Sequence, residues 1–165
     1  MKKIIQEQYN QNAKIYNSRY SRIQLDKYDI MSEYFPIYSK ALDLGCGTGL
    51  LSKKLKNLIG IDISLEMLKI AKTGEKVIQA QCESIPFKNN SFDTIFSFSA
   101  IQSTDNLEKT INEIKRVLIP QGTLILTVIK RKLDKNLRKI LNKTFKNIKE
   151  IECGEDIGFI CKEEA

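Results

Sequence analysis

Residues 41–49 read Ala-Leu-Asp-Leu-Gly-Cys-Gly-Thr-Gly, a short apolar run that ends in three alternating glycines. The run is typical of a buried β-strand, and Leu50, Leu51 and Leu55 follow at a spacing that predicts the inner face of a helix. Because glycine lacks a Cβ and tolerates positive φ, such a turn lets the backbone lie directly against a ligand. The free N–H groups at the start of the following helix favour an anionic ligand group. The segment therefore predicts a binding site for a small molecule that has a carboxylate or a phosphate.

The spacing of the glycines decides between classes of ligand. A dinucleotide-binding fold has G-x-G-x-x-G, whose third glycine packs the helix against the strand. In this chain Leu50 occupies the place of that third glycine, and no G-x-x-x-x-G-K-[S/T] sequence occurs. A nucleotide-binding oxidoreductase is therefore disfavoured, and a nucleotide P-loop is excluded.

Residues 42–49 resemble the first motif of the class I S-adenosylmethionine-dependent methyltransferases, and three later segments resemble further motifs of that family in the same order. These are the strand that ends at Asp62, the segment 77–97 and the helix–strand junction near residues 114–122. The resemblance covers about residues 9–130 and is to the type 11 methyltransferases, which are similar to those of ubiquinone biosynthesis. It implies S-adenosyl-L-methionine as the cofactor and methyl transfer as the activity.

The resemblance also implies which residues bind the cofactor. In the family the acid after the second strand holds the ribose and the next residue packs on the adenine, which here are Asp62 and Ile63. The acid that takes the adenine amino group corresponds to Gln81, whose amide oxygen is still a hydrogen-bond acceptor, and the next backbone N–H is that of Cys82. The predicted cofactor-binding set is Asp43, Gly45, Cys46, Gly47, Gly49, Asp62, Ile63, Met67, Gln81, Cys82 and Ser97.

The order of the segments predicts the fold class. Strands that alternate with helical patterns indicate an α/β fold with a parallel sheet and helices on both faces. The resemblance makes this a three-layer sandwich with a seven-stranded, mostly parallel sheet whose last strand is antiparallel. We expect a single domain over residues 1–165, with a helical lid at 1–36, a cofactor-binding core at 40–130, and a basic helix and terminal β-hairpin at 131–165.

The N-terminal segment is where we expect contacts to the methyl acceptor, because in the family it lies over the cofactor. Tyr16 and Tyr20 would stack on an acceptor and Arg19 would bind an anionic group, although packing of the tyrosines within the lid is an equal alternative. Gln102, where the family often has histidine, would orient the substrate but cannot act as a general base. The chain has no histidine. The acceptor is therefore already nucleophilic, or a carboxylate or tyrosinate deprotonates it, and no catalytic residue is assigned.

Positive charge is concentrated near the C-terminus. The net charge is +7, and residues 130–149 hold nine basic residues and one acid. A basic helix at 131–146 favours tRNA or another anionic partner, although an ordinary solvent-exposed helix is the simpler alternative. The acceptor is then a small molecule, tRNA or protein, and an activating subunit or a homo-oligomer would complete an open site. A non-catalytic S-adenosylmethionine-binding subunit that acts with a partner is the alternative to an enzyme.

Cysteine spacing and hydropathy limit the remaining classes. The four cysteines form no C-x-x-C pair, and the chain has no histidine, so we expect no metal site. No apolar run reaches about 18 residues, which predicts that the chain has no membrane span. We expect a cytoplasmic protein with reduced thiols.

Overall fold

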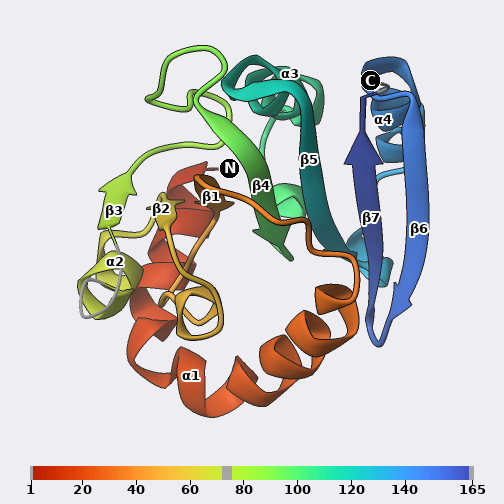
Figure 1. Cartoon of the computed structure of the whole chain (residues 1–165). Helices are drawn as coiled ribbons and strands as arrows, with labels where there is room; N and C mark the ends of the chain where they lie inside the picture. Colours follow the sequence, from red (N-terminus) through yellow and green to blue (C-terminus); the bar gives the residue numbers. More distant parts are fainter. Residues whose placement is uncertain (1, 72–75, 164–165) are drawn as a thin grey trace.

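A computed structural model describes residues 2–71 and 76–163. Within these residues, seven strands form one sheet in the order β3-β2-β1-β4-β5-β7-β6 (Figure 1). Neighbouring strands from β3 to β5 are parallel, whereas β7 is antiparallel to both β5 and β6. The predicted sheet, including its antiparallel last strand, is confirmed. The strands are β1 (Ala41–Leu44), β2 (Leu58–Asp62), β3 (Lys76–Gln79), β4 (Phe92–Phe98), β5 (Leu118–Ile129), β6 (Asn147–Cys153) and β7 (Asp156–Lys162).

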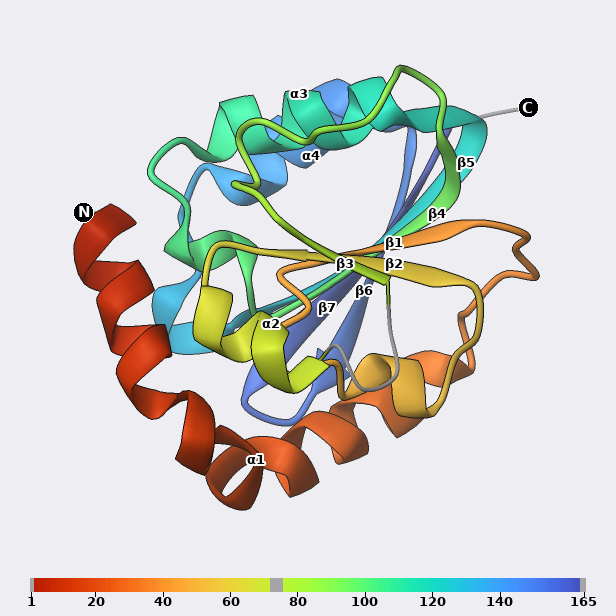
Figure 2. The same ribbon diagram turned by 90° about the vertical axis from the view of Figure 1, so that its left-hand side faces the viewer.

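Helices cover both faces of the sheet, as predicted (Figure 2). One face carries α1 (Lys2–Ser32) and the other carries α3 (Leu107–Val117) and α4 (Leu137–Thr144), while α2 (Leu65–Ala71) contacts α1 at one edge. Helix α3 has Ile111, Ile114 and Val117 at intervals of three residues, and these side chains are fully buried in the core. The result is the three-layer sandwich expected from the alternation of strands and helices.

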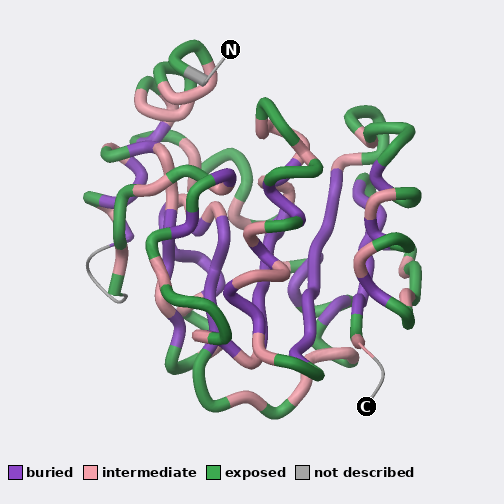
Figure 3. The backbone as a smooth tube through the Cα atoms, turned by 90° about the horizontal axis from the view of Figure 1, so that it is seen from above, coloured by how far each residue is buried: buried purple, intermediate pink, exposed green. Residues whose placement is uncertain are grey.

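The core lies on both faces of the central strands (Figure 3). Six of the seven residues of β4 are buried, as expected for a central strand with both faces covered, and they comprise three phenylalanines, Ile95 and the small polar residues Thr94 and Ser97. On the α1 face, Gly158 of β7 lets the helix come close. A Cβ at Gly158 would lie 2.5 Å from the Sδ atom of Met31. Glycine is therefore the residue that allows α1 to dock on β7.

The prediction of an α-helix directly after the glycine turn is wrong. The chain forms only a 3-10 turn, η1 (Leu51–Lys53), although Leu50 and Leu51 are buried as expected. Only eight residues separate Gly49 from the start of β2 at Leu58. An α-helix rises about 1.5 Å per residue and a 3-10 helix about 2.0 Å. The chain between Gly49 and β2 therefore holds one 3-10 turn in place of the predicted α-helix.

The basic helix predicted at 131–146 is also shorter than expected. Residues Lys130–Lys132 form a separate 3-10 turn, η3, and α4 begins only at Leu137. Between them the Asp134 carboxylate accepts a hydrogen bond from the N–H of Asn136 at 2.7 Å, and the Asp134 carbonyl accepts from the N–H of Leu137 at 3.0 Å. Aspartate favours such local turns over a continuous helix. The basic side chains are therefore divided between two elements.

Helix α1 lies over the loops that follow β1 and β2. Asn17 accepts a hydrogen bond from the hydroxyl of Thr48, and Asn10 accepts one from the hydroxyl of Ser64 at 2.6 Å. The Gln6 amide donates to the carbonyl of Ile63 at 2.9 Å. This is the position expected for a lid, although the division of the chain at residues 1–36, 40–130 and 131–165 stays a prediction.

Candidate functional site

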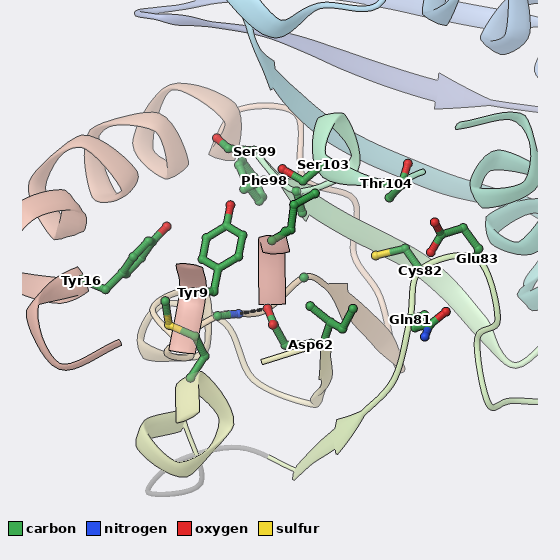
Figure 4. A pocket seen from close by; sticks show the side chains of 16 residues that line it. Tyr9, Tyr16, Asp62, Gln81, Cys82, Glu83, Phe98, Ser99, Ser103 and Thr104 are labelled. Carbon is green, nitrogen blue, oxygen red and sulfur yellow. Dashed lines mark hydrogen bonds between the residues drawn. The ribbon is translucent and has the colours of Figure 1, made fainter. Parts of the chain in front are cut away.

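A cavity lies at the carboxyl edge of the parallel strands, where the loops after β1, β2 and β4 meet below α1 (Figure 4). Open α/β sheets bind ligands in this region, because the strand order there changes direction. We call it the inner cavity. Its lining comprises Ile5, Tyr9, Tyr16, Gly45, Gly47, Asp62, Ile63, Met67, Gln81, Cys82, Glu83, Phe98, Ser99, Ala100, Ser103 and Thr104.

The glycine turn forms one wall of the inner cavity. Gly45, Gly47 and Gly49 have φ values of +78°, +54° and +75°, which side chains with a Cβ rarely adopt. A Cβ at Gly45 would lie 2.3 Å from the Cβ of Ala100, so glycine is needed there for packing. A Cβ at Gly47 would have no atom within 4 Å. Space for a ligand therefore lies directly beside the backbone of Gly47.

Asp62 ends β2 and presents its carboxylate to the inner cavity. Its Oδ2 atom accepts a hydrogen bond from the N–H of Gly47 at 2.9 Å, and its Oδ1 atom accepts from the N–H of Ser64 at 2.8 Å. Burial raises the pKa of Asp62 above 3.8, although hydrogen bonds from backbone N–H groups oppose the shift. Each oxygen retains capacity for a further hydrogen bond, so the carboxylate can hold two neighbouring hydroxyl groups.

Apolar and amide side chains form the rest of the inner cavity. Ile63 and Met67 lie beyond Asp62, and the hydroxyl of Ser64 accepts a hydrogen bond from the N–H of Met67 at 3.2 Å, which caps α2. Gln81 and Cys82 lie on the loop after β3 (Figure 4). The arrangement suits a flat aromatic group with polar atoms on its edge.

Seven of the eleven predicted cofactor residues lie together in this cavity, and four lie outside it. Asp43 and Cys46 line a small cavity behind the glycine turn. Gly49 closes the turn by donating its N–H to the carbonyl of Cys46 at 3.0 Å. Ser97 is fully buried, and its hydroxyl donates to the carbonyl of Leu44 at 3.1 Å, so it joins β4 to β1. The seven that line the cavity are Gly45, Gly47, Asp62, Ile63, Met67, Gln81 and Cys82.

A second cavity, of about 530 Å³, adjoins the first, and we call it the outer cavity. The two share Ile5, Tyr9, Tyr16, Ser99 and Ser103. Helix α1 forms one side, and the chain after β4, η3 and the β6–β7 turn form the other. All four residues predicted to contact the acceptor line this cavity, namely Tyr16, Arg19, Tyr20 and Gln102.

Sequence reasoning missed a buried ion pair in the wall of the outer cavity. The ammonium of Lys27 lies 2.9 Å from the carboxylate of Asp156, and their side chains are only 4% and 2% exposed. The hydroxyls of Ser99 and Thr127 donate to the same carboxylate oxygen at 2.6 and 2.8 Å. Lys27 also donates to the Ser99 hydroxyl. This network joins α1, β4, β5 and β7 at the boundary between the cavities.

Ser99 has a φ of +52°, which is unusual for a residue other than glycine. Besides the contacts of its hydroxyl, its N–H donates to the carbonyl of Thr127 at 3.0 Å and its carbonyl accepts from the Gln102 amide. Such backbone strain persists where the surroundings determine the conformation completely, and it is concentrated at functional sites. In the sequence, only the position of Ser99 after an apolar strand indicated that it belongs to the site. No sequence pattern indicated that Lys27 and Asp156 do.

Two tyrosines of α1 reach toward the inner cavity (Figure 4). Burial raises the pKa of Tyr16 to about 12, and burial also raises the pKa of Tyr9. Both phenols are therefore protonated near neutral pH. Neither can act there as the tyrosinate base that the sequence left open.

No group of three potential ligands that could hold a metal ion occurs among residues 2–71 and 76–163. All four cysteines, Cys46, Cys82, Cys153 and Cys161, are free thiols. In the part of the chain that the structure describes, no helix has the length and apolar character needed to cross a membrane.

Comparison with known proteins identifies the class of protein that this fold and site define. The model of the methyltransferase domain family matches residues 42–126, more than half of the 165 residues. The chain belongs to this family, and its cofactor is S-adenosylmethionine.

Individual proteins are also similar in sequence to this chain. An uncharacterised protein of Methanocaldococcus jannaschii is 38% identical over 151 residues, which cover 84% of this chain and 60% of that protein. A ubiquinone/menaquinone biosynthesis C-methyltransferase of Wigglesworthia glossinidia brevipalpis is 32% identical over 117 residues, 61% of this chain and 47% of that enzyme. The chain therefore spans 60% or less of the length of these relatives.

A solved structure shows the same fold. An S-adenosylmethionine-dependent methyltransferase of Thermotoga maritima superposes with a TM-score of 0.82 at 20% identity, covering 94% of this chain and 98% of that one. At this identity the likeness establishes the architecture, and it leaves the acceptor open.

The residues of the inner cavity fit S-adenosylmethionine. Gly47 leaves space beside its backbone for the methionyl group, and the Asp62 carboxylate can accept from both ribose hydroxyls. The cavity has a volume of about 90 Å³. This is below the roughly 300–1,000 Å³ of typical ligand sites. Tyr9 and Tyr16 of α1 line this cavity and also the outer cavity that adjoins it.

Proposed function

We propose that the protein transfers the methyl group of S-adenosylmethionine to an acceptor that binds in the outer cavity. The meeting of the two cavities at Ser99 and Ser103 is the observation that carries this proposal. The cofactor supplies a methyl group already activated on a sulfonium. The protein then mainly holds the acceptor in line with that group, and alignment of this kind can be worth about 7–11 kcal/mol of barrier.

The proposed roles of the lining residues follow from their chemistry. Tyr16 and Tyr20, whose ring centroids lie 5.0 Å apart, offer aromatic surfaces to an acceptor. Arg19 supplies a positive charge, and Gln102 supplies an amide that can orient a polar group. The Lys27–Asp156 pair fixes α1 and Ser99 in place. None of these groups is a strong base at neutral pH, which favours acceptors that are nucleophilic without one.

A small acceptor is favoured over tRNA by the placement of the basic side chains. Arg138 of α4 is paired with Glu150 at 2.8 Å, and Lys143 lies 3.4 Å from Glu108. Arg131 and Lys132 of η3 line the outer cavity together with Arg19 of α1, which supports their use in binding a compact anionic group. A tRNA or protein acceptor, an activating subunit and a homo-oligomer all stay predictions that need direct tests.

The test is methyl transfer from tritiated S-adenosylmethionine to three separate pools: low-molecular-weight metabolites, bulk tRNA and total protein. We expect label in the metabolite pool, and less of it for Gln102→Leu. Label in tRNA or protein would favour the macromolecular acceptor instead. Cofactor binding without label in any pool would favour the non-catalytic subunit.

We also propose a cytoplasmic location, which the four free thiols support.

A further inference from the structure

The outer cavity has chemically different ends. Gln24 and Gln102 are hydrogen-bonded to Tyr16 and Ser99, which line both cavities, so their amides lie at the end next to the inner cavity. Arg19 of α1 and the η3 turn line the outer cavity alone, away from that junction. We infer that the acceptor is an amine that carries a carboxylate or a phosphate at its other end. This inference rests on the proposed function, because it places the acceptor in the outer cavity.

Two unpartnered hydrogen-bond acceptors lie at the end next to the inner cavity. The carbonyl oxygens of Gln24 and Gln102 are buried and have no hydrogen-bond partner among the described residues. The amide nitrogen of Gln24 donates to the Tyr16 hydroxyl at 3.4 Å, and that of Gln102 donates to the Ser99 carbonyl. Unpaired buried carbonyl groups are unfavourable, so a ligand that donates hydrogen bonds is favoured here. Because protein atoms cover the two oxygens, the inference requires each amide side chain to rotate toward the ligand, which breaks the bond from Gln102 to the Ser99 carbonyl.

An amine fits this end better than a hydroxyl group does. A neutral primary amine has two N–H donors for the two carbonyl oxygens and a lone pair left for the methyl group. A hydroxyl has only one proton for the two carbonyl oxygens and would need a base to remove it. The chain has no histidine, burial raises the pKa of Tyr16 to about 12, and the Asp156 carboxylate is already bonded to Lys27, Ser99 and Thr127.

The reaction with an amine balances without a protein base. The ammonium form of the acceptor first releases a proton to water in the outer cavity. The amine nitrogen then forms a bond to the methyl carbon while the bond from that carbon to sulfur breaks. The sulfur leaves neutral, and the methylated ammonium product releases its proton to water.

Positive charge surrounds the opposite end. Arg19, Arg131 and Lys132 line the cavity, and no ion pair involves them within residues 2–71 and 76–163. The lining contains two acids, Glu155 and Asp156, and Lys27 already neutralises Asp156. The lining therefore has more unpaired positive side chains than unpaired negative ones, which favours an anionic group on the acceptor.

The test is an NMR titration of the protein saturated with S-adenosylhomocysteine. The probes with both groups are 4-aminobutyrate and 2-aminoethyl phosphate, which distinguish a carboxylate from a phosphate. The probes that lack one group are propylamine, butyrate and ethyl phosphate, and 4-hydroxybutyrate replaces the amine by a hydroxyl. We expect at least one probe with both groups to bind about tenfold more tightly than its matched probes.

Two variants separate the contributions of the two groups. In the double variant Arg131→Gln, Lys132→Gln, the anionic group of the probe should no longer increase the affinity. In Gln102→Leu, the amine of the probe should no longer increase the affinity. Lys135→Gln is the matched control and should change neither.

Three results would overturn the inference: tight binding of 4-aminobutyrate that 4-hydroxybutyrate equals, no advantage of either two-group probe over its matched probes, or no binding of either two-group probe. Failure of S-adenosylhomocysteine itself to bind is a different result. It would contradict the proposed function and this inference with it.

Discussion

Asp62 combines a function in binding with an unfavourable buried charge. Burial raises its pKa above 3.8, so the folded protein keeps this proton to a higher pH than the unfolded chain does. The contribution of Asp62 to stability is therefore fully present below pH 3.8 and is lost as the pH rises through the folded pKa.

The variant Asp62→Asn does not titrate, which makes this contribution measurable. We expect the free energy of unfolding of the variant, minus that of the wild type, to increase as the pH rises through the folded pKa. Urea unfolding across the acid and neutral range measures the difference. A difference that does not change with pH would show that the folded pKa of Asp62 is ordinary.

Two glycines allow backbone strain to be separated from ligand contact. Gly47 and Gly154 have φ values of +54° and +63°, and a Cβ at either position would meet no atom within 4 Å. Each Gly→Ala change should lower the free energy of unfolding by about 1–2 kcal/mol, because the left-handed conformation is strained. Only Gly47→Ala should also weaken S-adenosylhomocysteine binding, by about tenfold, since its methyl group enters ligand space. Equal calorimetric affinities for the two variants would mean that the ligand does not contact Gly47.

The Lys27–Asp156 pair should contribute strongly to stability, in contrast to exposed pairs. Lys27→Met leaves the Asp156 carboxylate buried without its counter-ion, and we expect a loss of about 3–5 kcal/mol in the free energy of unfolding. Lys130→Met breaks the exposed pair with Glu152 and should change it by less than about 1 kcal/mol. Similar losses for the two variants in urea unfolding would contradict the assigned burial.

At the level of elements, α1 depends on close packing against β7. In Gly158→Ala the new methyl group meets Met31, and we expect a loss of about 1–3 kcal/mol in the free energy of unfolding. Met31→Ala removes the obstructing side chain, so its effect should be smaller in the Gly158→Ala background than in the wild type. A double-mutant cycle from urea unfolding tests this coupling. Strictly additive effects would show that the two residues do not interact.

The sequence predicted the elements wherever periodicity and local chemistry agreed. The glycine turn, the strands around it and the final hairpin follow from apolar runs and turn residues. Two predicted helices were wrong. The short connection between Gly49 and β2 holds only the 3-10 turn η1, and the Asp134 turn interrupts a segment with good helical periodicity. Apolar spacing alone contains neither piece of information.

For the whole molecule, the sheet order brings the predicted site residues to one edge. Residues as distant as Tyr16 and Gln102 line the same outer cavity. The residues that motifs identified were those that contact ligand through the backbone or a carboxylate, such as Gly47 and Asp62. Lys27 and Asp156 escaped prediction because a buried ion pair becomes visible only when α1 is placed against β7.

The central claim is that the inner cavity binds S-adenosylmethionine through Asp62. Calorimetric titration of the wild type, Asp62→Ala and Asp93→Ala with S-adenosylmethionine tests it most directly. The Asp93 carboxylate is the control, because it accepts hydrogen bonds from the N–H groups of Ser39 and Lys40 and does not line the cavity. We expect the wild type and Asp93→Ala to bind equally, and Asp62→Ala to bind about 100-fold more weakly through loss of charge-assisted hydrogen bonds. Equal affinity for Asp62→Ala, or no binding by the wild type, would contradict the account.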